Sequence, residues 1–144
     1  MTLTAERALL ISILDTLVPP GGDFPGAGTV ALDHILAAAA ASPDLDALLC
    51  RALHAVGEGG GAGRFASMSG DDREAVLRGV EQSQPEAFAA LVRHTYFGYY
   101  GHPTVITALG LDPTPVQPRG HQPDPLEPPD LARVTERGPI YRAT

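Results

Sequence analysis

The sequence contains five histidines and one cysteine, the side chains that most readily act as bases, nucleophiles or metal ligands at neutral pH. Two of the histidines, His94 and His102, flank a group of aromatic residues, and either could act as a general base. No nucleophile stands at a defined spacing from them, and there is no G-x-S-x-G motif. We therefore expect a partly exposed His94 on a helix, a His102 that bonds the backbone in the turn before Pro103, and no catalytic residue.

Cys50 and His54 are four residues apart, so on a helix they share one face. A zinc site would need two further ligands, and the sequence offers no C-x-x-C or H-E-x-x-H motif to supply them. Because Leu49 and Leu53 are their neighbours, packing of this face in the core is the simpler interpretation. We expect no metal and no cofactor bound by this chain.

A glycine run, GEGGGAG at residues 57–63, looks superficially like a phosphate-binding loop. It lacks the lysine of the G-x-x-x-x-G-K-[ST] motif, and no strand is predicted before it. We interpret the run as a flexible connector between helices.

Half of the eight aromatic residues lie within five positions, as Tyr96, Phe97, Tyr99 and Tyr100. The cluster could be core, a ligand platform or an interface hot spot. Four aromatics in five residues cannot all face one side of a helix, so some must point away from the chain's own core. This geometry, followed directly by a proline-rich segment, favours an interface.

The elements that position these residues are helical. Apolar residues recur with the 3.6-residue period of amphipathic helices in five segments: one before Pro19, one from Thr29 to Ala41, one after the cap Ser42, one after the cap Ser69, and one from Pro85. We expect Gly98 and Gly101 to loosen the last helix. The lone Phe24, in the loop PPGGDFPGAG, is typical of an anchor onto the core.

The sequence thus predicts an all-α fold with two parts. Residues 1–111 form a compact bundle of about five helices, and residues 112–144 form a long, extended, proline-rich tail. Eight of the fourteen prolines lie between Pro113 and Pro139, where they exclude helix and inner strand. A partner-binding tail and a disordered linker are both compatible with this composition.

Charge and hydropathy exclude several classes of partner. The net charge is −7 and there is no basic stripe, which disfavours nucleic acid and anionic membrane surfaces. No apolar run approaches the roughly 20 residues that span a bilayer. The N-terminus lacks a basic region and a twin-arginine pair. We expect a cytoplasmic location for the sequence as printed, and a periplasmic one if the printed sequence is trimmed or a signal-bearing partner exports the chain.

The order of several short motifs resembles a known family. These are Leu17-Val18-Pro19, Asp23 with Pro25-Gly26-Ala27-Gly28, Phe88 with Leu91-Val92, Thr95-Tyr96-Phe97-Gly98-Tyr99-Tyr100, and Leu109-Gly110 before a proline-rich end. The chain resembles the gluconate 2-dehydrogenase subunit 3 family, the small subunit of bacterial FAD-dependent sugar and sugar-acid dehydrogenases. Two departures are the missing twin-arginine signal and a segment after the tyrosines that has neither Asn nor Trp.

The resemblance implies a non-catalytic helical subunit that binds a large flavoprotein of the glucose-methanol-choline type and helps it to fold, take up flavin or be exported. FAD and the catalytic histidines would then belong to the partner. The residues that we expect at the partner interface are Phe24, Tyr96, Phe97, Tyr99, Tyr100, His102, Pro103, Leu126, Ile140 and Tyr141. The alternative is a stand-alone helical protein that binds a small ligand in a pocket near Tyr96–Tyr100.

Overall fold

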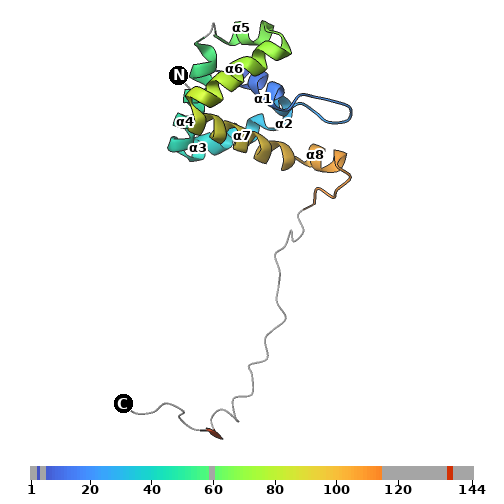
Figure 1. Cartoon of the computed structure of the whole chain (residues 1–144). Helices are drawn as coiled ribbons and strands as arrows, with labels where there is room; N and C mark the ends of the chain where they lie inside the picture. The colour runs from blue at the N-terminus through green and yellow to red at the C-terminus, as the bar shows by residue number, and fades with distance from the viewer. Residues whose placement is uncertain (1–2, 4–5, 59–60, 115–135, 138–144) are drawn as a thin grey trace, which may run out of the picture. The chain divides into compact units, whose positions relative to one another are not determined.

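The computed structural model describes residues 3, 6–58, 61–114 and 136–137 of the chain (Figure 1). The chain divides into two units, Met1–Pro113 and Thr114–Thr144. In the second unit the description covers Thr114, Glu136 and Arg137. Most of the predicted extended tail, including Leu126, Ile140 and Tyr141, therefore lies outside the described residues.

The first unit is all-α, as the sequence predicts, and no strand occurs among the described residues. Its helices are α1 (Arg7–Leu17), α2 (Ala27–Val30), α3 (Leu32–Ala41), α4 (Pro43–Gly57), α5 (Gly61–Ser67), α6 (Gly70–Ser83), α7 (Pro85–Tyr100) and α8 (Pro103–Ala108). Helices α1, α3, α4, α6 and α7 have ten or more residues each and correspond to the five predicted helices. The short helices α5 and α8 are additions, and α2 is the separate first part of the second predicted helix.

Two of the helix starts follow the predicted capping chemistry. The hydroxyl of Ser42 accepts a hydrogen bond from the backbone N–H of Leu45 at 3.3 Å, at the start of α4. The hydroxyl of Ser69 accepts one from the backbone N–H of Asp72 at 3.2 Å, at the start of α6. Each bond satisfies a donor that the first turn of a helix leaves unpaired.

The glycine run is not simply a connector, so that prediction is wrong in part. Helix α4 continues to Gly57 and α5 begins at Gly61. Helix α5 buries Phe65, which is 1% exposed. Glycine costs a helix about 1 kcal/mol per residue relative to alanine, whereas burial of one phenylalanine contributes about 1.5–3 kcal/mol. The aromatic contact therefore offsets the poor local propensity.

The second predicted helix begins two residues early and is divided into α2 and α3. The cause is Asp15 on α1, whose Oδ1 accepts a hydrogen bond from the backbone N–H of Gly28 at 2.7 Å. A Cβ atom at Gly26 would collide with the same carboxylate, and one at Gly28 would lie 2.8 Å from it. The glycines of the P-G-A-G segment therefore let α2 begin directly on the side chain of Asp15, which acts as its cap.

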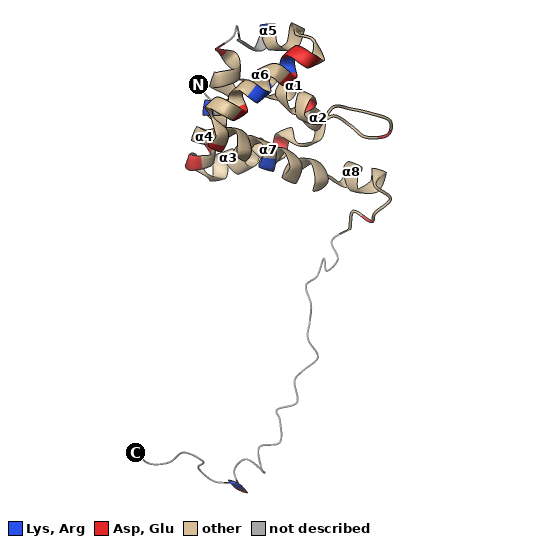
Figure 2. Ribbon diagram, viewed as in Figure 1, with Lys and Arg blue, Asp and Glu red and all other residues tan. Residues whose placement is uncertain are grey.

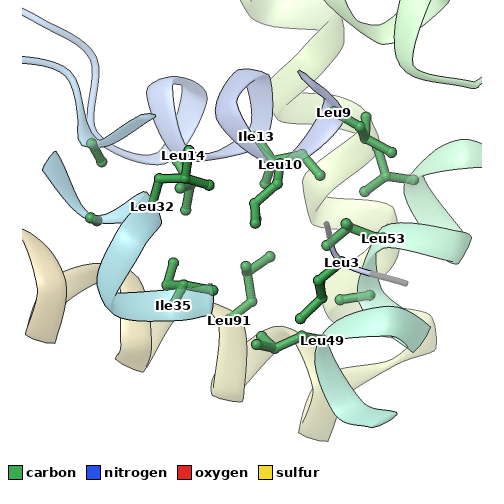
Figure 3. Close-up of a cluster of buried hydrophobic side chains, with 14 of the residues drawn as sticks. Leu3, Leu9, Leu10, Ile13, Leu14, Leu32, Ile35, Leu49, Leu53 and Leu91 are labelled. Carbon is green, nitrogen blue, oxygen red and sulfur yellow. The ribbon is translucent and has the colours of Figure 1, made fainter. Parts of the chain in front are cut away.

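The core lies between α1, α3, α4 and α7. Figure 3 shows Leu10 and Ile13 of α1 facing Ile35 of α3, Leu53 of α4 and Leu91 of α7, and each of these side chains is fully buried. Helix α7 packs against α2, α3, α4 and α6, which makes it the helix around which the bundle is arranged. Each fully buried side chain of this size contributes about 1.5–3 kcal/mol relative to exposure.

Gly98 does not loosen α7, contrary to the prediction, because the helix continues to Tyr100. Gly98 is buried against Ala31, and a Cβ atom there would lie 3.0 Å from the Cα, Cβ and O atoms of that residue. Glycine therefore serves as the point where α7 crosses closely over the junction between α2 and α3.

Candidate partner interface

The exposed large apolar side chains of the described residues gather at one end of the first unit. They are Phe24, Tyr96, Phe97, Tyr100, Leu109 and Leu111. All except Phe24 lie within residues 96–111, which comprise the last turns of α7, helix α8 and the turn after it. We call residues 96–111 the aromatic end. In Figure 1 it extends beyond the other helices, toward the right.

The orientation of α7 against the bundle determines which of the four aromatic rings are exposed to water. Thr95 is fully buried, and its hydroxyl donates a hydrogen bond to the carbonyl of Leu91 at 2.7 Å. Tyr99, four residues later, lies on the same face and is 4% exposed. Tyr96, Phe97 and Tyr100 then face outward, with 45%, 59% and 55% of their surface exposed.

The four aromatics therefore do point to different sides, as predicted. Tyr99 belongs to the core rather than to the exposed surface. Burial is the main cause that raises the pKa of its hydroxyl, and the neighbouring Tyr100 raises it further. Its ring meets the ring of Tyr100 edge-on, with 5.2 Å between their centroids. The buried ring of Tyr99 thus packs against the exposed ring of Tyr100.

The exposed rings are also held by one another. The rings of Tyr96 and Tyr100 lie 6.0 Å apart, and Phe97 meets the ring of His94 edge-on at 5.9 Å. Aromatic pairs of this kind contribute about 0.5–1.5 kcal/mol each beyond the area that they bury. The rings are therefore partly ordered before any partner binds, which lowers the entropy lost on binding.

The aromatic end carries no formal charge. Between Arg93 and Asp112 the sequence contains no Asp, Glu, Lys or Arg. Figure 2 shows this as an unbroken tan stretch from the last turns of α7 through α8, whereas the helices of the bundle carry red and blue segments. The centres of protein interfaces are depleted of charged residues and enriched in Tyr and Phe.

Helix α8 is set at the end of α7 by His102. Its ring nitrogen Nδ1 accepts a hydrogen bond from the backbone N–H of Thr104 at 3.3 Å, which confirms the prediction that it bonds the backbone. Pro103 is exposed at the first position of α8, and Val105 is fully buried. One cap and one buried valine therefore hold this short helix against the unit.

Phe24 is exposed in a tight loop, so the prediction that it anchors onto the core is wrong. The backbones of Gly21 and Phe24 exchange two hydrogen bonds of 3.0 Å, and Gly22 takes a positive φ of 58° in the turn between them. This bridge holds Phe24 at the outer end of the loop, 36% exposed. The loop and α8 extend to the same side of the unit in Figure 1.

A histidine pair lies behind the aromatic end. His34 on α3 stacks on His94 on α7, with 5.8 Å between centroids and 26° between ring planes. His94 is half-buried, as predicted, and its Nδ1 is buried without a hydrogen-bond partner. Burial is the main cause that lowers the pKa of His94, and the nearby His34 and Arg93 lower it further. Sequence reasoning missed this pair, because residues 60 positions apart carry no spacing signal.

The environment of Cys50 disfavours the reactive thiolate form of its side chain. Burial and the nearby Asp46 carboxylate, whose Oδ1 lies 4.0 Å from the sulfur, raise the pKa of the Cys50 thiol. His54 is exposed, with its Nε2 3.5 Å from a carboxylate oxygen of Glu58. Among the described residues, no group of three or more His, Cys, Asp or Glu could hold a metal ion.

Two of the hollows beside α7 bear on a ligand site near the aromatic end. One of about 250 Å³ is open between the start of α3 and the junction of α7 with α8, and Phe97 and His102 are part of its lining. The other, of about 390 Å³, is lined by residues of α6 and α7 such as Phe88 and Val92, and no residue of the aromatic end contributes to it.

Within the part of the chain that the structure describes, no helix is long and apolar enough to cross a membrane.

Comparison with known families gives a match over most of the chain. Residues 4–117, which include every helix from α1 to α8, match the family described as gluconate 2-dehydrogenase subunit 3. No curated protein and no solved structure matches the chain significantly. The family match covers the motifs on which the resemblance rests, from Leu17-Val18-Pro19 to Leu109-Gly110. The chain belongs to the gluconate 2-dehydrogenase subunit 3 family.

Proposed function

We propose that this chain is the non-catalytic small subunit of a FAD-dependent sugar or alcohol dehydrogenase complex. In this proposal it binds the large flavoprotein subunit and stabilises it or assists its maturation, while FAD and the catalytic residues belong to that partner. The observation that carries the proposal is the gathering of exposed aromatic and apolar side chains at residues 96–111. Family membership gives the kind of complex in which such a surface would be covered.

Several features of the aromatic end support a protein partner. Apolar surface left in water forgoes about 25 cal/mol per Å², so a chain gains from covering three exposed rings and two leucines. Tyr is enriched at interface hot spots, because it buries a large area with few rotatable bonds. The absence of charge in residues 94–111 removes the desolvation cost that Lys or Glu would add there.

The alternative, a stand-alone protein with a ligand pocket near Tyr96–Tyr100, has weaker support. The hollow beside Phe97 is about 250 Å³, which is below the roughly 300–1,000 Å³ typical of small-molecule sites. Neither Tyr96 nor Tyr100 lines it. The larger hollow lies along α6 and α7, away from the aromatic cluster.

We further propose that the tail, residues 112–144, lies along the large subunit. A proline-rich segment is already extended, so it loses little conformational entropy when it binds in a groove. We propose a cytoplasmic complex for the sequence as printed, and a periplasmic one if the printed sequence is trimmed or a signal-bearing partner exports the chain.

Co-purification tests the proposal. The tagged chain would be expressed with and without the glucose-methanol-choline-type flavoprotein encoded next to it, and both samples run on size exclusion with flavin absorbance recorded. We expect co-elution with a yellow partner, and poor solubility of the chain alone because its apolar end is uncovered. A well-behaved monomer that ignores the flavoprotein would overturn the proposal and favour the pocket alternative.

A further inference from the structure

The hollow of about 250 Å³ beside the aromatic end has room for one side chain rather than for a substrate. Asp33 and His34 of α3 lie on one wall. Phe97, Gly98 and Gly101, at the end of α7, lie on the other. Because Phe97 is also one of the exposed rings of the aromatic end, a partner that covers that end would also cover the mouth of this hollow.

Two charged features of the hollow favour a cation. Asp33 is part of the lining, and its exposed carboxylate forms a long ion pair with Arg7, with 3.7 Å between Oδ1 and Nη2. Helix α7 ends at Tyr100, between the lining residues Gly98 and Gly101, so the negative end of its dipole lies at the wall.

The ring of Phe97 gives a third reason, because an aromatic face attracts a cation that lies over it. It also favours a planar cation over a compact one. A guanidinium stacks on aromatic rings and donates a fork of hydrogen bonds to a carboxylate, whereas an ammonium group is a strongly hydrated point charge.

We propose that this hollow receives an arginine side chain of the large subunit, which would fix the position of the aromatic end on its partner. The inference rests on the proposed function for the identity of the partner, but the chemistry of the hollow can be tested without it. The net charge of −7 favours a partner surface of positive potential around the contact.

The first test uses a small probe and the full chain. N-acetyl-arginine methylamide would be titrated into the ¹⁵N-labelled protein while the amide signals of Gly98 and Gly101 are followed. The citrulline analogue, which has the same shape without the charge, and the lysine analogue are the matched controls. We expect saturable shifts at these amides with arginine, at least about fivefold weaker binding of lysine, and none of citrulline.

Equal shifts with citrulline would overturn the inference, because shape rather than charge would then be recognised. So would the same shifts with glucose or gluconate, which would make the hollow a sugar site. Unchanged amide signals up to the solubility limit of the arginine probe would overturn it as well.

The second test uses the complex. Asp33→Asn removes the charge from the hollow, and Asp44→Asn is the control, since both carboxylates are exposed in the first turn of a helix. We expect about tenfold weaker binding of the flavoprotein for Asp33→Asn, which is about 1.4 kcal/mol, and no change for Asp44→Asn. Equal weakening by both variants would indicate a general effect of charge or helix stability and would count against the hollow.

Different results would contradict the arginine site and the proposed function. If the wild-type chain binds the flavoprotein and Asp33→Asn binds equally well, the arginine site is wrong and the proposed function stands. If the wild-type chain does not bind the flavoprotein, the proposed function is wrong, and the probe titration still decides the chemistry of the hollow.

Discussion

The two ends of α7 both carry large apolar side chains but have opposite surroundings. From Pro85 to Thr95 the helix turns one face toward α3, α4 and α6, and Leu91 is fully buried. From Tyr96 to Tyr100 the helix is at least as rich in large apolar side chains, yet most of them face water. The comparison teaches that apolar content does not separate a core from an interface. The number of neighbouring elements that cover the helix makes the difference.

The contrast is sharpest between adjacent residues. Tyr99 is 4% exposed and Tyr100 is 55% exposed, although the two side chains are identical. Helical geometry turns successive side chains by about 100°, so only one of them can face the bundle. In a complete complex we expect Tyr100 to be as well covered as Tyr99.

The largest expected effect is on the stability of the chain itself. Leu91→Ala should lower the free energy of unfolding by about 2–5 kcal/mol, because it leaves a cavity in the core. Phe97→Ala, at the aromatic end, should lower it by less than about 1 kcal/mol. Chemical denaturation of the two variants measures the difference. Equal losses would mean that the aromatic end is part of the core of the isolated chain, which contradicts the comparison.

A smaller effect is expected where α7 leaves the bundle. Gly98→Ala places a Cβ atom 3.0 Å from backbone and side-chain atoms of Ala31, so we expect a loss of about 1–3 kcal/mol from the strain. Gly79→Ala on α6 is the control, because nothing lies within 4 Å of its Cβ. That variant should gain up to about 1 kcal/mol from better helix propensity. Thermal unfolding of both variants tests the opposite signs.

The smallest expected effect is a pH dependence at the junction of the two ends. Folding lowers the pKa of His94, chiefly by burial. As the pH falls through about 6.5, His94 therefore becomes protonated in the unfolded chain at a higher pH than in the folded chain. Stability from this group is complete above that pH and is lost as the pH falls toward the lower folded pKa. The charges around His94 are Arg93 and, when protonated, its stacking partner His34.

Unfolding at several pH values between about 7.5 and 5 tests this linkage. We expect a shallower loss of stability for His94→Gln than for the wild type, with a difference below about 1 kcal/mol because the ring is only half-buried. A His94→Gln slope as steep as that of the wild type would contradict the linkage.

Local signals in the sequence predicted much of the fold. The five long helices follow from apolar periodicity, and the caps at Ser42 and Ser69 follow from residue type. His102 was predicted to bond the backbone because it precedes Pro103. Each of these features depends on residues a few positions apart, which a single sequence displays directly.

Long-range contacts account for most of what sequence reasoning missed. Helix α5 forms because Phe65 finds a place in the core, and α2 begins early because Asp15 reaches Gly28 from another helix. Gly98 is a close crossing point only because Ala31 lies opposite. The pair of His34 and His94, and the hollow beside it, have the same origin. The choice of Tyr99 as the buried ring depended on how α7 is rotated against the bundle.

The most direct test of the central claim is the affinity of the full-length chain for the large flavoprotein, measured for the double variant Phe97→Ala/Tyr100→Ala. The matched control is Arg78→Ala, on the exposed face of α6. The account predicts binding about 100-fold weaker for the double variant, or about 2.7 kcal/mol, with unfolding little changed and the control unaffected. A double variant that folds normally and binds the flavoprotein as tightly as the wild type would contradict the assignment of the aromatic end as the partner interface.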